Sequence, residues 1–100
     1  MISKGCTCKN IFSLPFNEND ISVLFITYQQ NGKTVVEKVK DDCEFTDGHV
    51  SVLLTQEDTL KLLNESTVKI QIRLRLNDGS VTKSHVIETY TDIVLKNEVI

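Results

Sequence analysis

The sequence contains no alanine, no tryptophan and only one proline, and none of its apolar runs is long. The missing alanine, together with 11 Val, 9 Ile and 10 Thr, disfavours helices and favours strands. A transmembrane helix needs about 20 consecutive apolar residues, so the sequence predicts none. With 100 residues, of which 40% are hydrophobic and 25% charged, the chain has the composition of one globular domain.

Basic residues are outnumbered, since 11 Lys and Arg stand against 14 Asp and Glu and give a net charge of −3. Binding to nucleic acid or to an anionic membrane surface requires a basic face, so we expect neither partner. The first residues also lack the apolar segment of a secretory signal. We therefore expect the protein to be cytoplasmic when it is synthesised.

The three cysteines, Cys6, Cys8 and Cys43, match no familiar metal or redox motif. One residue separates Cys6 from Cys8, whereas thioredoxin-type pairs have two, and a structural zinc ion takes four ligands. His49 or His85 could complete a zinc site, or assist a cysteine nucleophile, only if the fold brought them together. We expect free thiols with no metal and no cofactor. The alternatives are a disulfide within or between chains, and a small enzyme or metal protein built on Cys6, Cys8 and a histidine.

Carboxylates gather in one turn region, at Asp41, Asp42, Glu44 and Asp47. Their spacing differs from that of an EF-hand calcium loop, and a domain of this size offers no deep cleft for paired-carboxylate hydrolysis. We expect them to be solvated loop charges. The sequence as a whole therefore predicts a protein that is not an enzyme.

Alternating and apolar runs predict strands over residues 10–16, 21–30, 33–40, 43–45, 49–54, 68–76 and 81–91. Pro15 indicates that the first of these is an edge strand. The first half of 21–30 is apolar on both faces and predicts a central strand covered on both sides. Asn31-Gly32 predicts a type I′ hairpin turn. Residues 93–100 are apolar enough to pack as a last strand or against a neighbour.

One short helix is predicted from Thr55, a capping residue followed by acidic side chains, to about Leu63. Strands separated by turns every 8–12 residues, with this single crossover helix, predict an all-β protein. We expect an immunoglobulin-like antiparallel β-sandwich of about seven strands with one short helical crossover. It forms a single domain over residues 1–100, with residues 1–9 as a candidate flexible N-terminal segment.

Basic side chains recur at every second position of the strand over residues 68–76. Alternation places Lys69, Gln71, Arg73 and Arg75 on one face and the apolar residues on the other. One interpretation is a solvated face with cross-strand partners such as Glu88. The other is a docking face for an acidic partner protein. Tyr28 likewise is either an interface residue or part of the core.

Several segments together resemble a known group of proteins. They are Lys4-Gly5, Ile11-Phe12-Ser13-Leu14-Pro15-Phe16, Ile26-Thr27-Tyr28-Gln29-Gln30-Asn31-Gly32-Lys33, Leu54-Thr55-Gln56-Glu57-Asp58-Thr59-Leu60, Ile70-Gln71-Ile72-Arg73 and Ser84-His85-Val86-Ile87. Over residues 4–95 the chain resembles small prophage-encoded proteins of low-GC Gram-positive gut bacteria. It is similar, more loosely, to the N-terminal domain of phage baseplate upper proteins.

This resemblance implies a non-enzymatic structural or adapter module of a phage tail or baseplate. Such a module would assemble with other tail proteins or with copies of itself, and would pass from the bacterial cytoplasm into the virion. The alternative function is a stand-alone binding module for a host-surface protein or a carbohydrate. For a carbohydrate, the absence of tryptophan and the presence of only two tyrosines are unfavourable.

Overall fold

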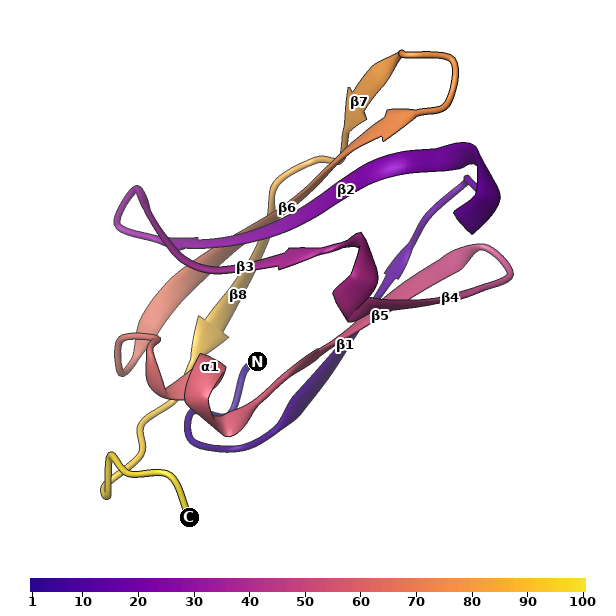
Figure 1. The fold of residues 1–100 in the computed structure, drawn as a ribbon. Coiled ribbons are helices and arrows are strands. Elements are labelled where there is room, and N and C mark those ends of the chain that lie inside the picture. Colours follow the sequence, from indigo (N-terminus) through magenta and orange to yellow (C-terminus); the bar gives the residue numbers. More distant parts are fainter.

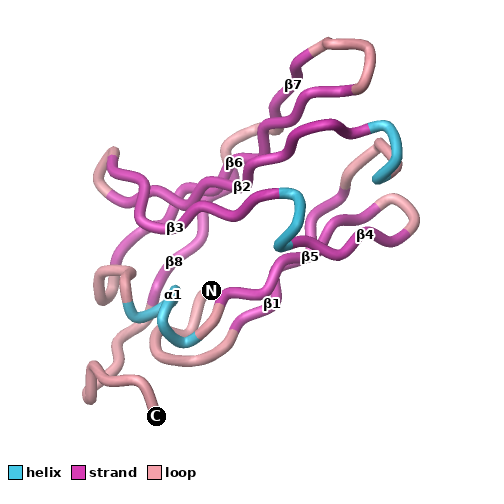
Figure 2. The backbone as a smooth tube through the Cα atoms, in the orientation of Figure 1, coloured by secondary structure: helices cyan, strands magenta, loops and turns pink.

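A computed structural model describes all residues, 1–100, as two antiparallel sheets packed face to face (Figures 1 and 2). The smaller sheet has the strand order β1-β5-β4. The larger has the order β3-β2-β6, and both β7 and β8 pair with the free side of β6. The strands are β1 (Cys8–Ser13), β2 (Ile21–Gln30), β3 (Lys33–Val39), β4 (Cys43–Thr46), β5 (His49–Leu54), β6 (Ser66–Leu76), β7 (Val81–Lys83) and β8 (Ile87–Thr91).

This strand order is that of an immunoglobulin-like sandwich. Strands β1, β5 and β4 correspond to strands B, E and D of that fold, and β3, β2, β6 and β7–β8 correspond to C′, C, F and G. The predicted fold class is therefore confirmed, with eight strands rather than about seven. The extra strand arises because the expected strand over 81–91 is interrupted at residues 84–86.

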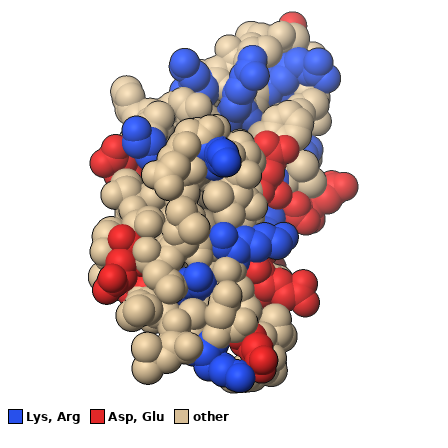
Figure 3. All heavy atoms as spheres, turned by 90° about the vertical axis from the view of Figure 1, so that its left-hand side faces the viewer, with Lys and Arg blue, Asp and Glu red and all other residues tan.

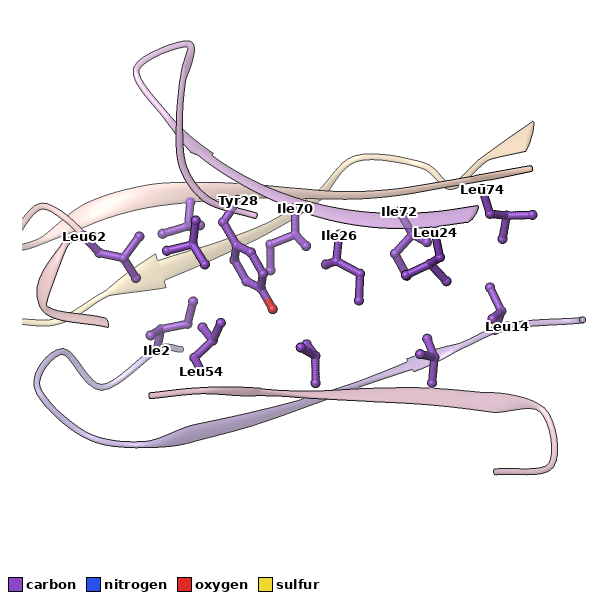
Figure 4. Packing of buried hydrophobic residues seen from close by; sticks show 14 of the residues in the cluster. Ile2, Leu14, Leu24, Ile26, Tyr28, Leu54, Leu62, Ile70, Ile72 and Leu74 are labelled. Atoms are coloured by element: carbon purple, nitrogen blue, oxygen red, sulfur yellow. The ribbon is translucent and has the colours of Figure 1, made fainter. Parts of the chain in front are cut away.

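The hydrophobic core fills the space between the two sheets (Figure 4). Alternate residues of each strand point inward, so the larger sheet contributes residues such as Leu24, Ile26 and Ile72, and the smaller sheet contributes Val50 and Val52. The inward phase of β6 is the predicted one. The expectation that β2 is covered on both sides is wrong, because its outward residues face solvent and Phe25 is 38% exposed.

The hairpin turn at Asn31-Gly32 and the start of the helix after Thr55 form where the sequence predicts them. Asn31 and Gly32 have positive φ values of 52° and 75°, as a type I′ turn requires. Helix α1 (Gln56–Leu60) begins where Thr55 Oγ1 accepts a hydrogen bond from Asp58 N at 3.1 Å. The helix ends before the expected Leu63. It leads the chain from the smaller sheet to the larger one.

The two ends of the chain contribute to the fold in different ways. Residues 1–9, the candidate flexible segment, contribute to the fold, because Ile2 is buried and bridges Thr91 in parallel. Strand β1 begins at Cys8 and ends before Pro15, and it does lie at a sheet edge. Residues 93–100 form no strand; Leu95 is exposed, and the backbone of Ile100 bonds to a side chain of α1. No helix is long and apolar enough to span a membrane.

Candidate docking surface

The outward side of the larger sheet, which we call the outer face, carries the four residues singled out from the sequence. Lys69, Gln71, Arg73 and Arg75 occupy successive outward positions of β6, opposite the buried positions of the same strand. The alternation of β6 is therefore confirmed. The face is uncovered, since no other element packs over it (Figures 1 and 2).

Strand pairing arranges the outer face in rows that run across the sheet. The row through Arg73 consists of Val39, Phe25, Arg73 and Lys83, from β3 to β7. The row through Lys69 consists of Thr34, Gln29, Lys69 and Glu88, from β3 to β8. Beyond the first of these rows, Arg75 lies between Val23 and Val81.

One end of the outer face is both cationic and apolar. We call it the cationic end and define it by Arg73, Arg75, Lys83, Val23, Phe25 and Val81. In Figure 3, Lys and Arg side chains gather at the upper end of the molecule, where the β6–β7 hairpin lies in Figure 1. A shallow hollow of about 170 Å³ lies between the apolar side chains and the two arginines.

None of the cations on the outer face forms an ion pair within the chain. The three salt bridges of the molecule join Lys9 to Glu44, Lys38 to Asp58 and Lys96 to Glu98. The register does place Glu88 opposite Lys69, as one interpretation of the sequence required, but no salt bridge joins them. The guanidinium of Arg75 has only a 3.4 Å contact from Nε to a serine hydroxyl of β2.

The interruption at residues 84–86 gives the outer face a second hollow. Ser84 stays attached to β6, because its N–H donates to Ile72 O at 2.8 Å and its hydroxyl accepts from Ile72 N at 3.0 Å. Gln71 Nε2 donates to Ser84 O at 3.1 Å. His85 and Val86 then project from the sheet, and Val86 borders a hollow of about 480 Å³ that reaches across to Glu37.

Tyr28, considered above as an interface residue, belongs to the core. Its side chain is fully buried, and its hydroxyl accepts a hydrogen bond from Asn10 Nδ2 at 2.7 Å. Burial raises the pKa of Tyr28 to about 12; the bond from Asn10 opposes this rise, and the nearby thiols and Asp58 add to it. Tyr28 is thus a buried neutral phenol that links the two sheets.

The structure does not assemble the alternative metal or cysteine site. Cys8 lies opposite Leu54 and Ser13 lies opposite His49, so Cys8 and His49 occupy opposite ends of the β1–β5 pair. The three cysteines form no disulfide. No group of three or more His, Cys, Asp or Glu side chains could hold a metal ion. The four carboxylates expected as solvated loop charges are all exposed, but Glu44 lies in β4, and Asp41 and Asp42 lie in a single 3-10 turn before it.

Reasoning from the sequence missed three contributors to this surface. Phe25 was expected under a covering layer, although alternation with the buried Leu24 and Ile26 places its side chain on the outward side. Lys83 was overlooked because only the pairing of β7 with β6 reveals that it lies beside Arg73. Val86 was read as part of a continuous strand, and no sequence signal marks its displacement.

Comparisons with known proteins assign the chain to no family. No protein-family model matches the sequence, and no curated protein matches it significantly. Among solved structures, the V domain of amphioxus IgVJ-C2 aligns with 91% of this chain and 97% of its own length. Its sequence identity is 10% and its TM-score is 0.36. The immunoglobulin-like assignment therefore rests on the strand order described above.

Proposed function

We propose that the protein is a non-enzymatic protein–protein interaction module that serves as a structural or adapter part of a phage tail or baseplate. The observation that supports a docking role is the outer face, which leaves Phe25 and unpaired arginines uncovered on a regular sheet. The assignment to a phage particle rests on the resemblance of residues 4–95 to prophage and baseplate proteins.

The chemistry of the outer face favours a macromolecular partner over a small substrate. Its hollows are shallow and open, whereas small-molecule sites bury most of their ligand. Aromatic residues and arginine are enriched where proteins bind one another, because they combine apolar area with directional hydrogen bonds. Phe25 beside Arg73 supplies both in adjacent positions.

The proposal is tested on phage particles from an induced lysogen that encodes the chain. We expect mass spectrometry of purified particles to detect it among the tail proteins. Phe25→Glu should remove it from the particles, because a charge replaces the apolar centre of the face. Ile11→Glu is the matched control, since Ile11 is an exposed apolar strand residue on the outer side of the other sheet.

Absence of the wild-type chain from purified particles would contradict the proposal. If the chain instead bound host cells or immobilised glycans, the alternative of a stand-alone binding module for a host-surface protein or carbohydrate would take its place. Loss of both variants from the particles would contradict docking through the outer face.

A further inference from the structure

Two cations lie directly opposite each other on the outer face, and the fold gains nothing from this arrangement. Arg73 and Lys83 are paired residues on β6 and β7. Directly opposed side chains on antiparallel strands have Cβ atoms about 4.5–5.5 Å apart, and like charges at such positions are destabilising. No carboxylate lies within ion-pair distance of either residue. A pair selected only for stability would carry opposite charges.

The carboxylate in the turn that joins β6 to β7 is already engaged. Asp78, at the tip of the β6–β7 hairpin, accepts hydrogen bonds from Ser80 N at 2.8 Å and Ser80 Oγ at 2.6 Å. These two bonds lower the pKa of Asp78 and hold its carboxylate within the turn. The repulsion between Arg73 and Lys83 therefore remains uncompensated inside the molecule.

Arg75 extends the site along β6. It lies two residues from Arg73, a separation of about 7 Å at the rise of an antiparallel strand. An extended polypeptide has the same spacing between alternate side chains. One carboxylate of such a chain could bind Arg73 and Lys83 together. A second carboxylate, two residues further along, could then bind Arg75. The hollow between them, lined by Phe25 and Val81, offers an apolar contact.

We propose that the cationic end binds an extended acidic segment of the partner protein, with acidic residues at alternate positions and an apolar side chain against Phe25. This inference rests on the proposed docking function and specifies the chemistry of the partner. Guanidinium groups suit carboxylates because they can donate two parallel hydrogen bonds. The uncompensated charge of Arg73 and Lys83 then has a role, since the partner supplies the missing anions.

The charge distribution favours an acidic polypeptide over a nucleic acid. The chain has a net charge of −3, and the cationic end contains only three basic side chains. Nucleic acids carry a dense and continuous array of phosphates, which a basic face must follow over many contacts. Glu37 and Glu88 lie on the same outer face and would repel a phosphate backbone that ran along it.

The test uses Lys83→Glu in the full chain, with binding and stability measured on the same protein. The probe is a short fluorescein-labelled peptide whose alternate positions carry glutamate, glutamate and valine on one side, with serine at the positions between them. It is compared with a peptide of the same composition whose glutamates are contiguous. Fluorescence anisotropy should show preferred binding of the alternating peptide, and this binding should weaken with salt. Lys83→Glu should weaken it at least about tenfold, because it removes one cation, places a like charge beside the peptide and gives Arg73 a partner within the chain.

The stability readout should move in the opposite direction. Because Lys83→Glu replaces a repulsive pair by an attractive one, its urea midpoint should lie above that of the wild type. Lys33→Glu is the control, as it makes the same charge change at the far end of the same sheet, where Lys33 forms no salt bridge. It should leave peptide binding nearly unchanged.

Equal binding of the peptide by wild type and Lys83→Glu would overturn the inference, as would tighter binding of a single-stranded DNA oligonucleotide than of the peptide. A urea midpoint below that of the wild type would show that Arg73 and Lys83 are not in repulsive contact. Failure of the inference remains distinguishable from failure of the proposed function. If Phe25→Glu is lost from phage particles and Lys83→Glu is retained, docking stands and the acidic partner does not.

Discussion

The buried phenol of Tyr28 predicts a specific response of the protein to alkaline pH. Tyr28→Phe removes the hydroxyl that accepts the 2.7 Å hydrogen bond from Asn10 and changes little else in the core. A hydrogen bond of this kind contributes about 1 kcal/mol net, and leaving one partner unsatisfied adds to the loss. Asn10 is only half-buried and regains contact with water. We therefore expect a loss of about 1–1.5 kcal/mol in the free energy of unfolding at pH 8.

The stability advantage of the wild type over Tyr28→Phe should shrink and then reverse as the pH rises. The pKa of Tyr28 is about 12 in the folded protein, against an ordinary value of 10.0 for the unfolded chain. When folding raises the pKa of a group, its contribution to stability is complete at any pH below its pKa in the unfolded chain. That contribution is lost as the pH approaches its pKa in the folded protein. With one pKa unit equal to about 1.4 kcal/mol, the wild type loses about 1.4 kcal/mol between pH 8 and about pH 11.

The phenylalanine variant does not have this dependence, so the two stability curves should cross near pH 11. Urea unfolding followed by circular dichroism, at half-unit steps from pH 8 to about pH 11.5, measures both curves over the range in which tyrosine titrates. Burial also raises the pKa of Cys43 to about 11. That thiol is present in both proteins, so its own titration contributes to both curves.

Tyr90→Phe supplies the control, because Tyr90 is 43% exposed and forms no side-chain hydrogen bond. Its stability curve should run parallel to that of the wild type. A constant offset between Tyr28→Phe and the wild type across the whole pH range would refute the reasoning. It would mean that Tyr28 ionises in the folded protein as readily as in the unfolded chain.

Two further predictions concern groups that hold the larger sheet and the crossover helix. Ser84→Ala should destabilise the protein by about 1–2 kcal/mol and speed amide exchange at Ile72, because the hydroxyl that accepts from Ile72 N at 3.0 Å is lost; unchanged exchange there would contradict it. Burial alone would raise the pKa of Asp58, but bonds from Lys38 and Thr55 lower it below 3.8. Asp58→Asn should therefore reduce stability at pH 7 and flatten its decline below about pH 4 in acid-unfolding experiments. If the variant lost stability below about pH 4 as steeply as the wild type, the role of the carboxylate would be contradicted.

Much of the fold could be predicted because local signals and tertiary packing agree. Asn31-Gly32 accepts positive φ values at both positions, and the turn forms where the sequence indicates it. In β6, strict alternation separates buried residues from Lys69 and Arg73, so the face of each side chain could be assigned before the strand order was known. Thr55 likewise caps the helix that its neighbours predict.

Other features depend on contacts that no local pattern encodes. Phe25 belongs to an apolar run. Its side chain is uncovered because the fold has only two layers and nothing packs over the outer face, which the run itself does not indicate. The interruption after Lys83 depends on the hydroxyl of Ser84 taking the place of a backbone carbonyl opposite Ile72. This hydrogen bond joins residues twelve positions apart in the sequence, so no periodic pattern of side chains indicates it. The pairing of Arg73 with Lys83 could be recognised only once the register was known.

The interruption at residues 84–86 also affects how copies of the molecule meet one another at high concentration. A continuous edge strand would present a long ladder of free N–H and C=O groups on which another chain could add as a strand, and such edges promote aggregation. Here that side of the sheet is divided into segments of three and five residues, β7 and β8. Each segment offers another chain only a short ladder, so strand addition by a second copy is disfavoured on this side and meets a continuous strand only at the opposite edge, where β3 is unbroken over seven residues.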